Sequence, residues 1–136
     1  MILDLIALDN SSKVWIYQAD REFTYDELDE AREHIYHFLK DWTAHSSALD
    51  CYGNIFHRRF LALFVDESGA KASGCSIDKS VKFVTALGAK YDMDLFDRMT
   101  YAYMTEDEYI HTVSHQDLPS AYQNGSVTDE TLFFNN

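Results

Sequence analysis

The chain has 136 residues, enough for one domain with a sizeable core and too few for two. Apolar residues make up 46% of it and aromatic residues 15%, which excludes an intrinsically disordered chain. The formal net charge is −12, from 23 acidic and 11 basic residues. Nucleic acid is therefore not expected as a partner, because its binding depends on clustered Lys and Arg. A basic protein or a cation is electrostatically easier to accept.

The sequence carries no signal for a membrane or for export. No apolar run approaches the roughly 20 residues that cross a bilayer, and the segment Met1–Asp9 has two acids in place of the basic start of a signal peptide. The two cysteines, Cys51 and Cys75, form no CxxC pair and are expected to be free thiols. The prediction is a cytoplasmic protein that does not contact the membrane.

The first half of the chain alternates strand and helix patterns. Residues 14–19 are rich in β-branched and aromatic side chains, typical of a strand. Thr24 and Glu27 have capping-box spacing and predict a helix start, with an apolar stripe at helical spacing to about Ala44. Two further strands are expected, a weak one over 49–56 and a continuously apolar, central one over 60–65 that is covered on both faces.

The second half begins with a loop up to Cys75 and a second helix. Ser76 or Asp78 would serve as the N-cap of that helix. The elements expected after it are a strand over 100–104, a short helix over 118–122 ended near Gly125, and an edge strand at Phe133-Phe134. From Thr105 onward the chain is mostly polar.

The order strand, helix, strand, strand, helix, strand predicts an α+β fold. Right-handed crossovers favour a ferredoxin-like βαββαβ sandwich, an antiparallel sheet with two helices on one face. Residues 1–104 would form this core domain, and residues 105–136 a polar C-terminal extension packing on it. The first helix would end, and the second begin, at one edge of the sheet, so that His45 and Cys75 share a rim. An open edge or face of the sheet would also allow a homodimer.

Cys75 is the sharpest candidate for chemistry. A thiol at a helix N-terminus feels the partial positive charge of unpaired N–H groups, which favours the thiolate. Gly74 would let the backbone turn tightly and approach a ligand. His45, just past the first helix, would be a base or a charge partner for this thiol. The alternative is that Cys75 is a small buried residue beneath the loop.

The side chains near Cys75 suggest a ligand site. Ser73, Ser76 and the backbone amides up to Asp78 would hold an anion or a carbonyl oxygen, and Trp42 would form an aromatic edge. In the alternative interpretation Ser76 only caps the helix, the Asp78 carboxylate competes for the same amides, and Trp42 closes the core.

No metal or cofactor is predicted. The weaker metal candidates are the carboxylates of Asp66-Glu67 with Asp78, and the pairs His34/His37 and His111/His115. None brings a complete ligand set. The chain has no GxxxxGK[ST], GxGxxG or GxSxG motif, so the usual phosphate loops and the nucleophile elbow are excluded.

Five runs of the sequence carry a family resemblance: Val14–Arg21, Trp42–His45, Arg59–Leu61, Ser73–Ser80 and Phe96–Met99. In them the chain resembles a small uncharacterised bacterial family whose members often carry the label "ABC transporter ATPase". The resemblance extends from about Lys13 to Asn136, and residues 73–78 are its most specific part. The label implies an ATPase, whereas this chain has no Walker A loop. The family motif matches fall on Trp42, His45, Ser73, Gly74, Cys75, Ser76 and Asp78.

Two kinds of function remain. The first is a ligand-binding or reactive-thiol site over residues 73–78, near His45, acting on an unidentified small ligand. The alternative is a non-enzymatic protein–protein interaction module. Its acidic charge, its nine Tyr and nine Phe, and a polar extension that ends in Phe133-Phe134 suit docking onto another, basic, protein.

Overall fold

The computed structural model describes residues 1–135, so that Asn136, the end of the predicted extension, lies outside the described residues. The chain forms two compact units, which divide after Phe96. We call residues 1–96 the N-terminal unit and the residues from 97 onward the C-terminal unit. Each contains at least one helix and a three-stranded antiparallel sheet, and the predicted α+β class is confirmed.

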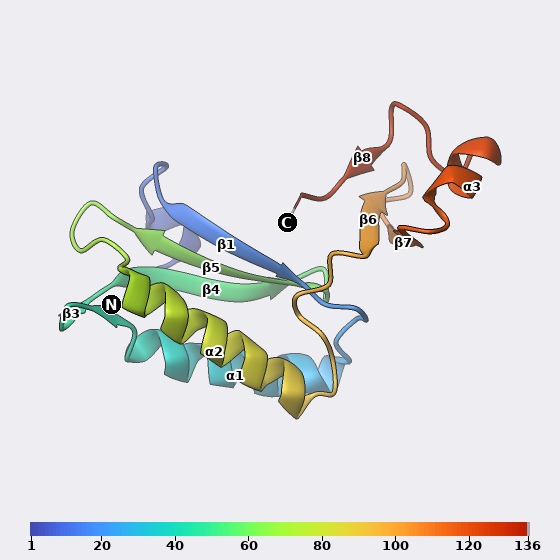
Figure 1. Cartoon of the computed structure of the whole chain (residues 1–136). Helices are drawn as coiled ribbons and strands as arrows, with labels where there is room; N and C mark the ends of the chain where they lie inside the picture. The colour runs from blue at the N-terminus through green and yellow to red at the C-terminus, as the bar shows by residue number, and fades with distance from the viewer. Residues whose placement is uncertain (136) are drawn as a thin grey trace. The chain divides into compact units, whose positions relative to one another are not determined.

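A three-stranded antiparallel sheet forms the centre of the N-terminal unit (Figure 1). Its strands are β1 (Lys13–Gln18), β5 (Phe60–Asp66) and β4 (Asp50–Phe56), in the order β1-β5-β4. Leu63 in the central strand lies opposite Trp15 on one side and Gly53 on the other. The continuously apolar segment is thus the central strand, as the sequence predicted. A short 3-10 helix, η1 (Leu5–Ala7), precedes β1.

Helices α1 (Tyr25–Lys40) and α2 (Gly74–Lys90) lie on the same side of this sheet (Figure 1). The predicted capping box of α1 is present, because Thr24 Oγ1 accepts from the Glu27 amide and the Glu27 carboxylate accepts from the Thr24 amide. The main core contains side chains from both helices and from one sheet face, among them Leu28, Ile35, Leu39, Leu61, Leu63, Val65, Val84 and Leu87.

Gly53 allows α1 to pack closely on β4. A Cβ atom at this position would lie 2.9 Å from Leu63 Cδ2, 3.1 Å from Ile35 Cγ2 and 3.2 Å from Leu39 Cδ1. Gly53 is therefore a close-packing position inside a regular strand.

The first helix ends at Lys40, and its predicted continuation to Ala44 is wrong. A hairpin follows instead, formed by β2 (Thr43–Ala44) and β3 (Ser47–Ala48). Trp42, just before β2, and Ala44 within it are buried, at 2% and 3% exposure. Their burial continues the apolar pattern of the helix, so periodicity alone did not show where the helix ends.

The strand expected to complete the sandwich belongs to the C-terminal unit. Strand β6 (Thr100–Met104) is the middle strand of a second antiparallel sheet, β7-β6-β8, with β7 (Ile110–Ser114) and β8 (Leu132–Phe133). A ferredoxin-like sheet would place it beside β1, but within residues 1–135 the named strand that pairs with β1 is β5. Only five residues separate β6 from β7, and closing so short a loop costs little entropy.

The C-terminal unit has its own small core. Helix α3 (Leu118–Gln123) lies where the sequence predicted it, and Gly125 follows with a φ of 80°. Tyr103, Ala121 and Val127 are buried together, with Val113 and Leu118 packed against them. The expected edge strand is confirmed as β8, which pairs with the end of β6. The predicted boundary after Met104 differs from the division after Phe96, because β6 joins the later strands.

Candidate functional site

The end of α1 and the start of α2 meet at one edge of the sheet, as predicted. Trp42 connects them, since its Nε1 donates a hydrogen bond of 2.9 Å to the backbone oxygen of Ser76. The indole ring also packs on Phe38 and Trp15, with ring centroids 5.1 and 6.3 Å away. At 2% exposure Trp42 fills the core beneath the rim, which is the structural alternative that the sequence left open.

Helix α2 begins at Gly74, earlier than expected, with Ser73 as its N-cap. Ser73 Oγ accepts from the Ser76 amide at 3.2 Å, and Ser76 Oγ accepts from the Ser73 amide at 2.5 Å. Ser76 thus occupies the place of Glu or Gln in a capping box. Its hydroxyl also donates to the Ser73 carbonyl at 2.8 Å, and its side chain is fully buried. These hydroxyl groups stabilise the helix start.

The backbone amides of the predicted anion site also donate hydrogen bonds within the helix start. The Ser76 amide is bound by the cap, and the Ile77 amide donates 2.9 Å to the Ser73 carbonyl. Asp78 is exposed beyond the first turn. A Cβ atom at Gly74 would have no neighbour within 4 Å, so no close approach requires glycine there.

Cys75 and His45 are both exposed at this rim. Cys75 lies in the first turn of α2, and His45 lies in the β2–β3 turn, where its φ is 50° and that of Ser46 is 67°. Within residues 1–135 no hydrogen bond or ion pair joins the imidazole to the thiol. Both residues thus lie near the rim, but no hydrogen bond links the imidazole to the thiol in the part of the chain that the structure describes.

Cys51 has a purely structural environment. Its Sγ atom is buried and donates to the backbone oxygen of Leu39 at 3.6 Å. Burial raises the pKa of the Cys51 thiol to about 11, so that it stays protonated at neutral pH. Both cysteines are free, as the sequence predicted, and Cys75 is the exposed one.

The carboxylates of Asp66 and Glu67 hold the loop that follows β5. Asp66 accepts from the Ser68 amide at 2.9 Å and from the Asp9 amide at 3.1 Å, and hydrogen bonds from the Ser68 side chain and backbone lower the pKa of this carboxyl. Glu67 pairs with Lys13 at 3.0 Å. In the part of the chain that the structure describes, no three His, Cys, Asp or Glu side chains are grouped to hold a metal ion.

Comparison of the chain with protein-family models, with curated protein sequences and with solved structures finds no match. Between residues 1 and 135, no helix combines the length and the apolar character needed to cross a membrane. Function is therefore inferred from the surfaces of the two units.

The sheet face opposite the helices contains none of the site residues predicted from the sequence. Side chains alternate along a strand, so the neighbours of the core residues Leu61, Leu63 and Val65 point away from the helices. We call this the outer face. It carries the apolar side chains of Val14, Ile16, Tyr52, Phe56, Phe60, Ala62 and Phe64, together with the polar Gln18 and Asn54, and Phe60 and Ala62 are buried. In the sequence, the continuously apolar segment that forms the central strand was the indication of this apolar face.

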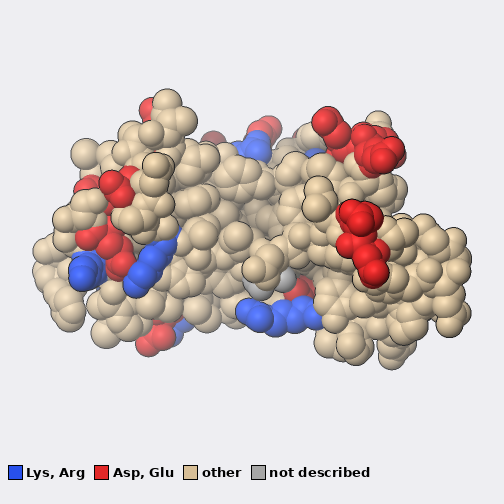
Figure 2. Space-filling view, turned by 90° about the horizontal axis from the view of Figure 1, so that it is seen from above, with Lys and Arg blue, Asp and Glu red and all other residues tan. Residues whose placement is uncertain are grey.

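Part of the outer face is open to solvent. Val14 lies opposite Phe64, which in turn lies opposite Tyr52, so one row of apolar side chains crosses all three strands. Val14 is 44% exposed and Ile16 37%. Figure 2 looks onto this side of the N-terminal unit and shows a mostly uncharged surface over the sheet.

Proposed function

We propose that the protein is a non-enzymatic binding module that docks a basic partner protein on the outer face of the N-terminal sheet. The observation that carries this proposal is that most side chains on the outer face are apolar and that Val14 and Ile16 on it are exposed, although helices α1 and α2 lie on the other side of the sheet (Figure 1). An antiparallel sheet with a solvated face normally alternates apolar and polar side chains. Contiguous apolar surface of this kind is typical of interaction sites.

The aromatic side chains of the outer face suit a protein interface. The rings of Tyr52 and Phe64 lie 5.9 Å apart, and those of Phe56 and Phe64 lie 6.5 Å apart. Asn54 Nδ2 donates 2.9 Å to the Tyr52 hydroxyl, which holds that ring in place. Aromatic residues are enriched at the centres of interfaces, where rigid side chains lose little entropy on binding.

The negative net charge of the chain favours a basic protein as the partner. At −12, two copies of this chain repel each other, and so do this chain and a nucleic acid. A basic protein is attracted, and complementary charge raises the rate of association. A basic partner is therefore favoured over the homodimer that an open sheet would otherwise allow.

The test compares two valines of similar exposure on different surfaces. Val14 is 44% exposed on the outer face, and Val81 is 39% exposed on α2. A photo-cross-linking amino acid placed at each position in turn is irradiated in native lysate. We expect a discrete adduct with a basic protein from position 14 and not from position 81. The purified partner should then bind Val14→Thr several-fold more weakly than Val81→Thr, and more weakly at high salt.

Three results would overturn the proposal. They are equal adducts from both positions, an adduct with a second copy of this chain, and equal loss of affinity in both valine variants. The last result would show that the outer face is not the contact surface. Because both substitutions are identical and both sites are partly exposed, a difference between them does not arise from side-chain chemistry alone.

A second candidate function is a thiol site at Cys75. The observation that favours it is that Cys75 is exposed in the first turn of a 17-residue helix, and that turn contains no acidic residue. The partial positive charge of the helix start would support a thiolate nucleophile. A small electrophilic ligand would approach from the open side of Gly74, where a Cβ atom would meet nothing within 4 Å.

The thiol candidate is tested by the rate of Cys75 alkylation in the folded and the urea-unfolded protein at one pH. An activated thiol reacts faster in the folded state, in a Cys51→Ser background whose fold is checked by circular dichroism. His45→Ala should slow the folded-state reaction if the imidazole supports the thiolate. A folded-state rate equal to or below the unfolded rate removes this candidate and leaves the binding module.

A further inference from the structure

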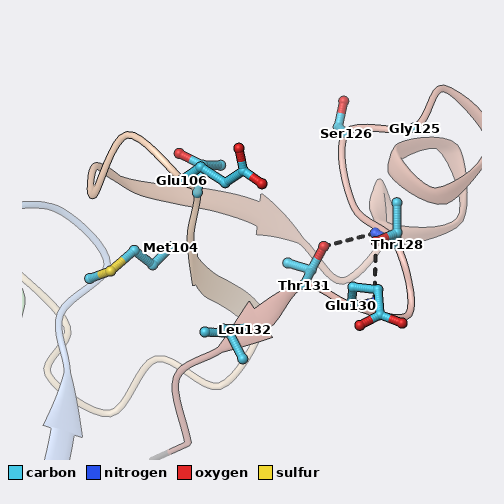
Figure 3. Close-up of a pocket in the computed structure, with 9 residues that line it drawn as sticks. Met104, Glu106, Gly125, Ser126, Thr128, Glu130, Thr131 and Leu132 are labelled. Carbon is cyan, nitrogen blue, oxygen red and sulfur yellow. Dashed lines mark hydrogen bonds between the residues drawn. The ribbon is translucent and has the colours of Figure 1, made fainter.

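The C-terminal unit contains a groove that no sequence pattern indicated. It has a volume of about 470 Å³, within the usual range for ligand pockets, and lies between the end of β6 and the segment before β8 (Figure 3). Its wall includes the apolar side chains of Met104 and Leu132. The same two residues line an adjoining apolar hollow of about 200 Å³ together with Phe133 and Phe134.

Two carboxylates come to this groove from different segments (Figure 3). Glu106 follows β6, and Glu130 precedes β8. Thr128 and Thr131 hold the second segment, because the Thr128 amide donates 2.8 Å to Thr131 Oγ1 and the Glu130 amide donates 3.2 Å to Thr128 Oγ1. The local fold thus uses the backbone of Glu130 and leaves its carboxylate for other contacts.

Neither carboxylate is neutralised by the protein. Within residues 1–135, Glu106 and Glu130 have no ion pair and no side-chain hydrogen bond. Asp107, next in the chain, differs, because its carboxylate accepts from the Thr105 hydroxyl and, at 3.1 Å, from the Tyr109 amide. Asp107 therefore has a structural role in its loop, whereas the two groove carboxylates have none.

The charge of the unit restricts what the groove can bind. Residues 97–136 contain seven acidic residues and a single basic one, Arg98. An anion would be repelled, and a purely apolar group would make no use of the two exposed carboxylates. A ligand with an apolar stem and a compact positive head fits both kinds of wall. A lysine side chain has this form, because its methylene stem packs on apolar surface while its ammonium group donates to carboxylates.

We propose that this groove binds a lysine side chain presented by an apolar segment of a basic protein. The stem packs along Met104 and Leu132, and the ammonium group is attracted by the exposed carboxylates of Glu106 and Glu130, which line the groove. The inference takes from the proposed function only that the partner is a basic protein. Its site is in the other unit, so either proposal can fail without the other.

The test titrates the full ¹⁵N-labelled chain with two capped peptides, Ala-Val-Lys-Val-Ala and the same sequence with norleucine for lysine. We expect the lysine peptide to shift the amide signals of Thr105, Ser126 and Thr131, and the norleucine peptide to leave them in place. Glu106→Gln and Glu130→Gln should each weaken binding roughly two- to five-fold, as for exposed ion pairs. Glu108→Gln is the control, since it removes a charge from the same loop without lining the groove.

Several outcomes would overturn this inference. Equal binding of the norleucine peptide would show that the carboxylates do not select the ligand. An equal loss in Glu108→Gln would show attraction by the net charge of the unit and no specific site. Binding of free 1,5-diaminopentane as tightly as the lysine peptide would make a small diamine the ligand. If neither peptide shifts the groove signals at millimolar concentration, the groove is not a lysine site.

Discussion

The two tight turns of the N-terminal unit give the sharpest quantitative test of its structure. Both place two consecutive non-glycine residues at positive φ, His45 and Ser46 at 50° and 67°, and His57 and Arg58 at 53° and 58°. A β-turn whose two central residues both have positive φ favours Asn-Gly there, because other side chains meet the backbone. Each turn is therefore replaced by Asn-Gly, and the free energies of unfolding of the two variants are compared.

The β2–β3 turn should gain stability. Left-handed backbone costs an ordinary residue about 1 kcal/mol or more, and within residues 1–135 the side chains of His45 and Ser46 have no hydrogen bond, ion pair or ring contact to lose. Glycine offsets roughly 0.5–1 kcal/mol of this gain, because it increases the conformational entropy of the unfolded chain. We expect His45→Asn/Ser46→Gly to stabilise the protein by about 1 kcal/mol.

The β4–β5 turn should lose stability under the same replacement. Arg58 Nε donates 2.9 Å to the Phe23 carbonyl, its guanidinium pairs with Glu22 at 3.2 Å, and its Cζ lies 4.3 Å from the centre of the Tyr25 ring. A hydrogen bond from a charged donor contributes about 1.5–3 kcal/mol and an exposed cation–π contact about 0.5–1 kcal/mol. These contacts outweigh the relieved strain, so His57→Asn/Arg58→Gly should destabilise by about 1–2 kcal/mol.

Urea unfolding followed by circular dichroism measures both changes, with an unchanged m-value as the control for an unchanged fold. A shift of the same sign in both turns would refute the reasoning, because the backbone strain is shared and only the side-chain contacts differ. The first variant also sharpens the thiol test. Since it is expected to be more stable, a slower alkylation of Cys75 in it cannot be attributed to unfolding.

Three further predictions use the same unfolding assay. Gly53→Ala should destabilise the protein by about 1 kcal/mol, because its Cβ would lie 2.9 Å from a leucine methyl group. Gly74→Ala should stabilise it by up to about 0.5 kcal/mol, because a Cβ there would have no neighbour within 4 Å. Equal effects of the two substitutions would contradict this packing. Hydrogen bonds from Arg21 lower the pKa of Glu27 from 4.5 to about 2, so their stabilisation is present above pH 4.5 and is lost as the pH falls towards 2. Glu27→Gln should therefore cost about 1–2 kcal/mol at pH 7 and almost nothing near pH 2, and a cost independent of pH would contradict this. Trp42→Phe should cost about 2 kcal/mol by removing a buried hydrogen bond between the two helix ends, and a neutral result would show that this bond is not formed.

Much of the site prediction depended on which residues lie within a helix, and the sequence placed these boundaries wrongly. Ser76 was considered as an N-cap, yet Ser73 has that role and Ser76 completes the capping box. A serine in place of the usual Glu or Gln gave no signal for this box. His45 was expected just past a helix end and lies instead in a hairpin turn.

The sequence by itself determined the local features of the protein. Spacing predicted the capping box at Thr24, burial of the central strand β5, and helix α3 with Gly125 after it, because each depends on neighbours close in the chain. Tertiary structure alone decided the partner of β6 and the packing at Gly53. These depend on loop closure and on contacts between distant segments, and the spacing of residues along one segment carries no information about either.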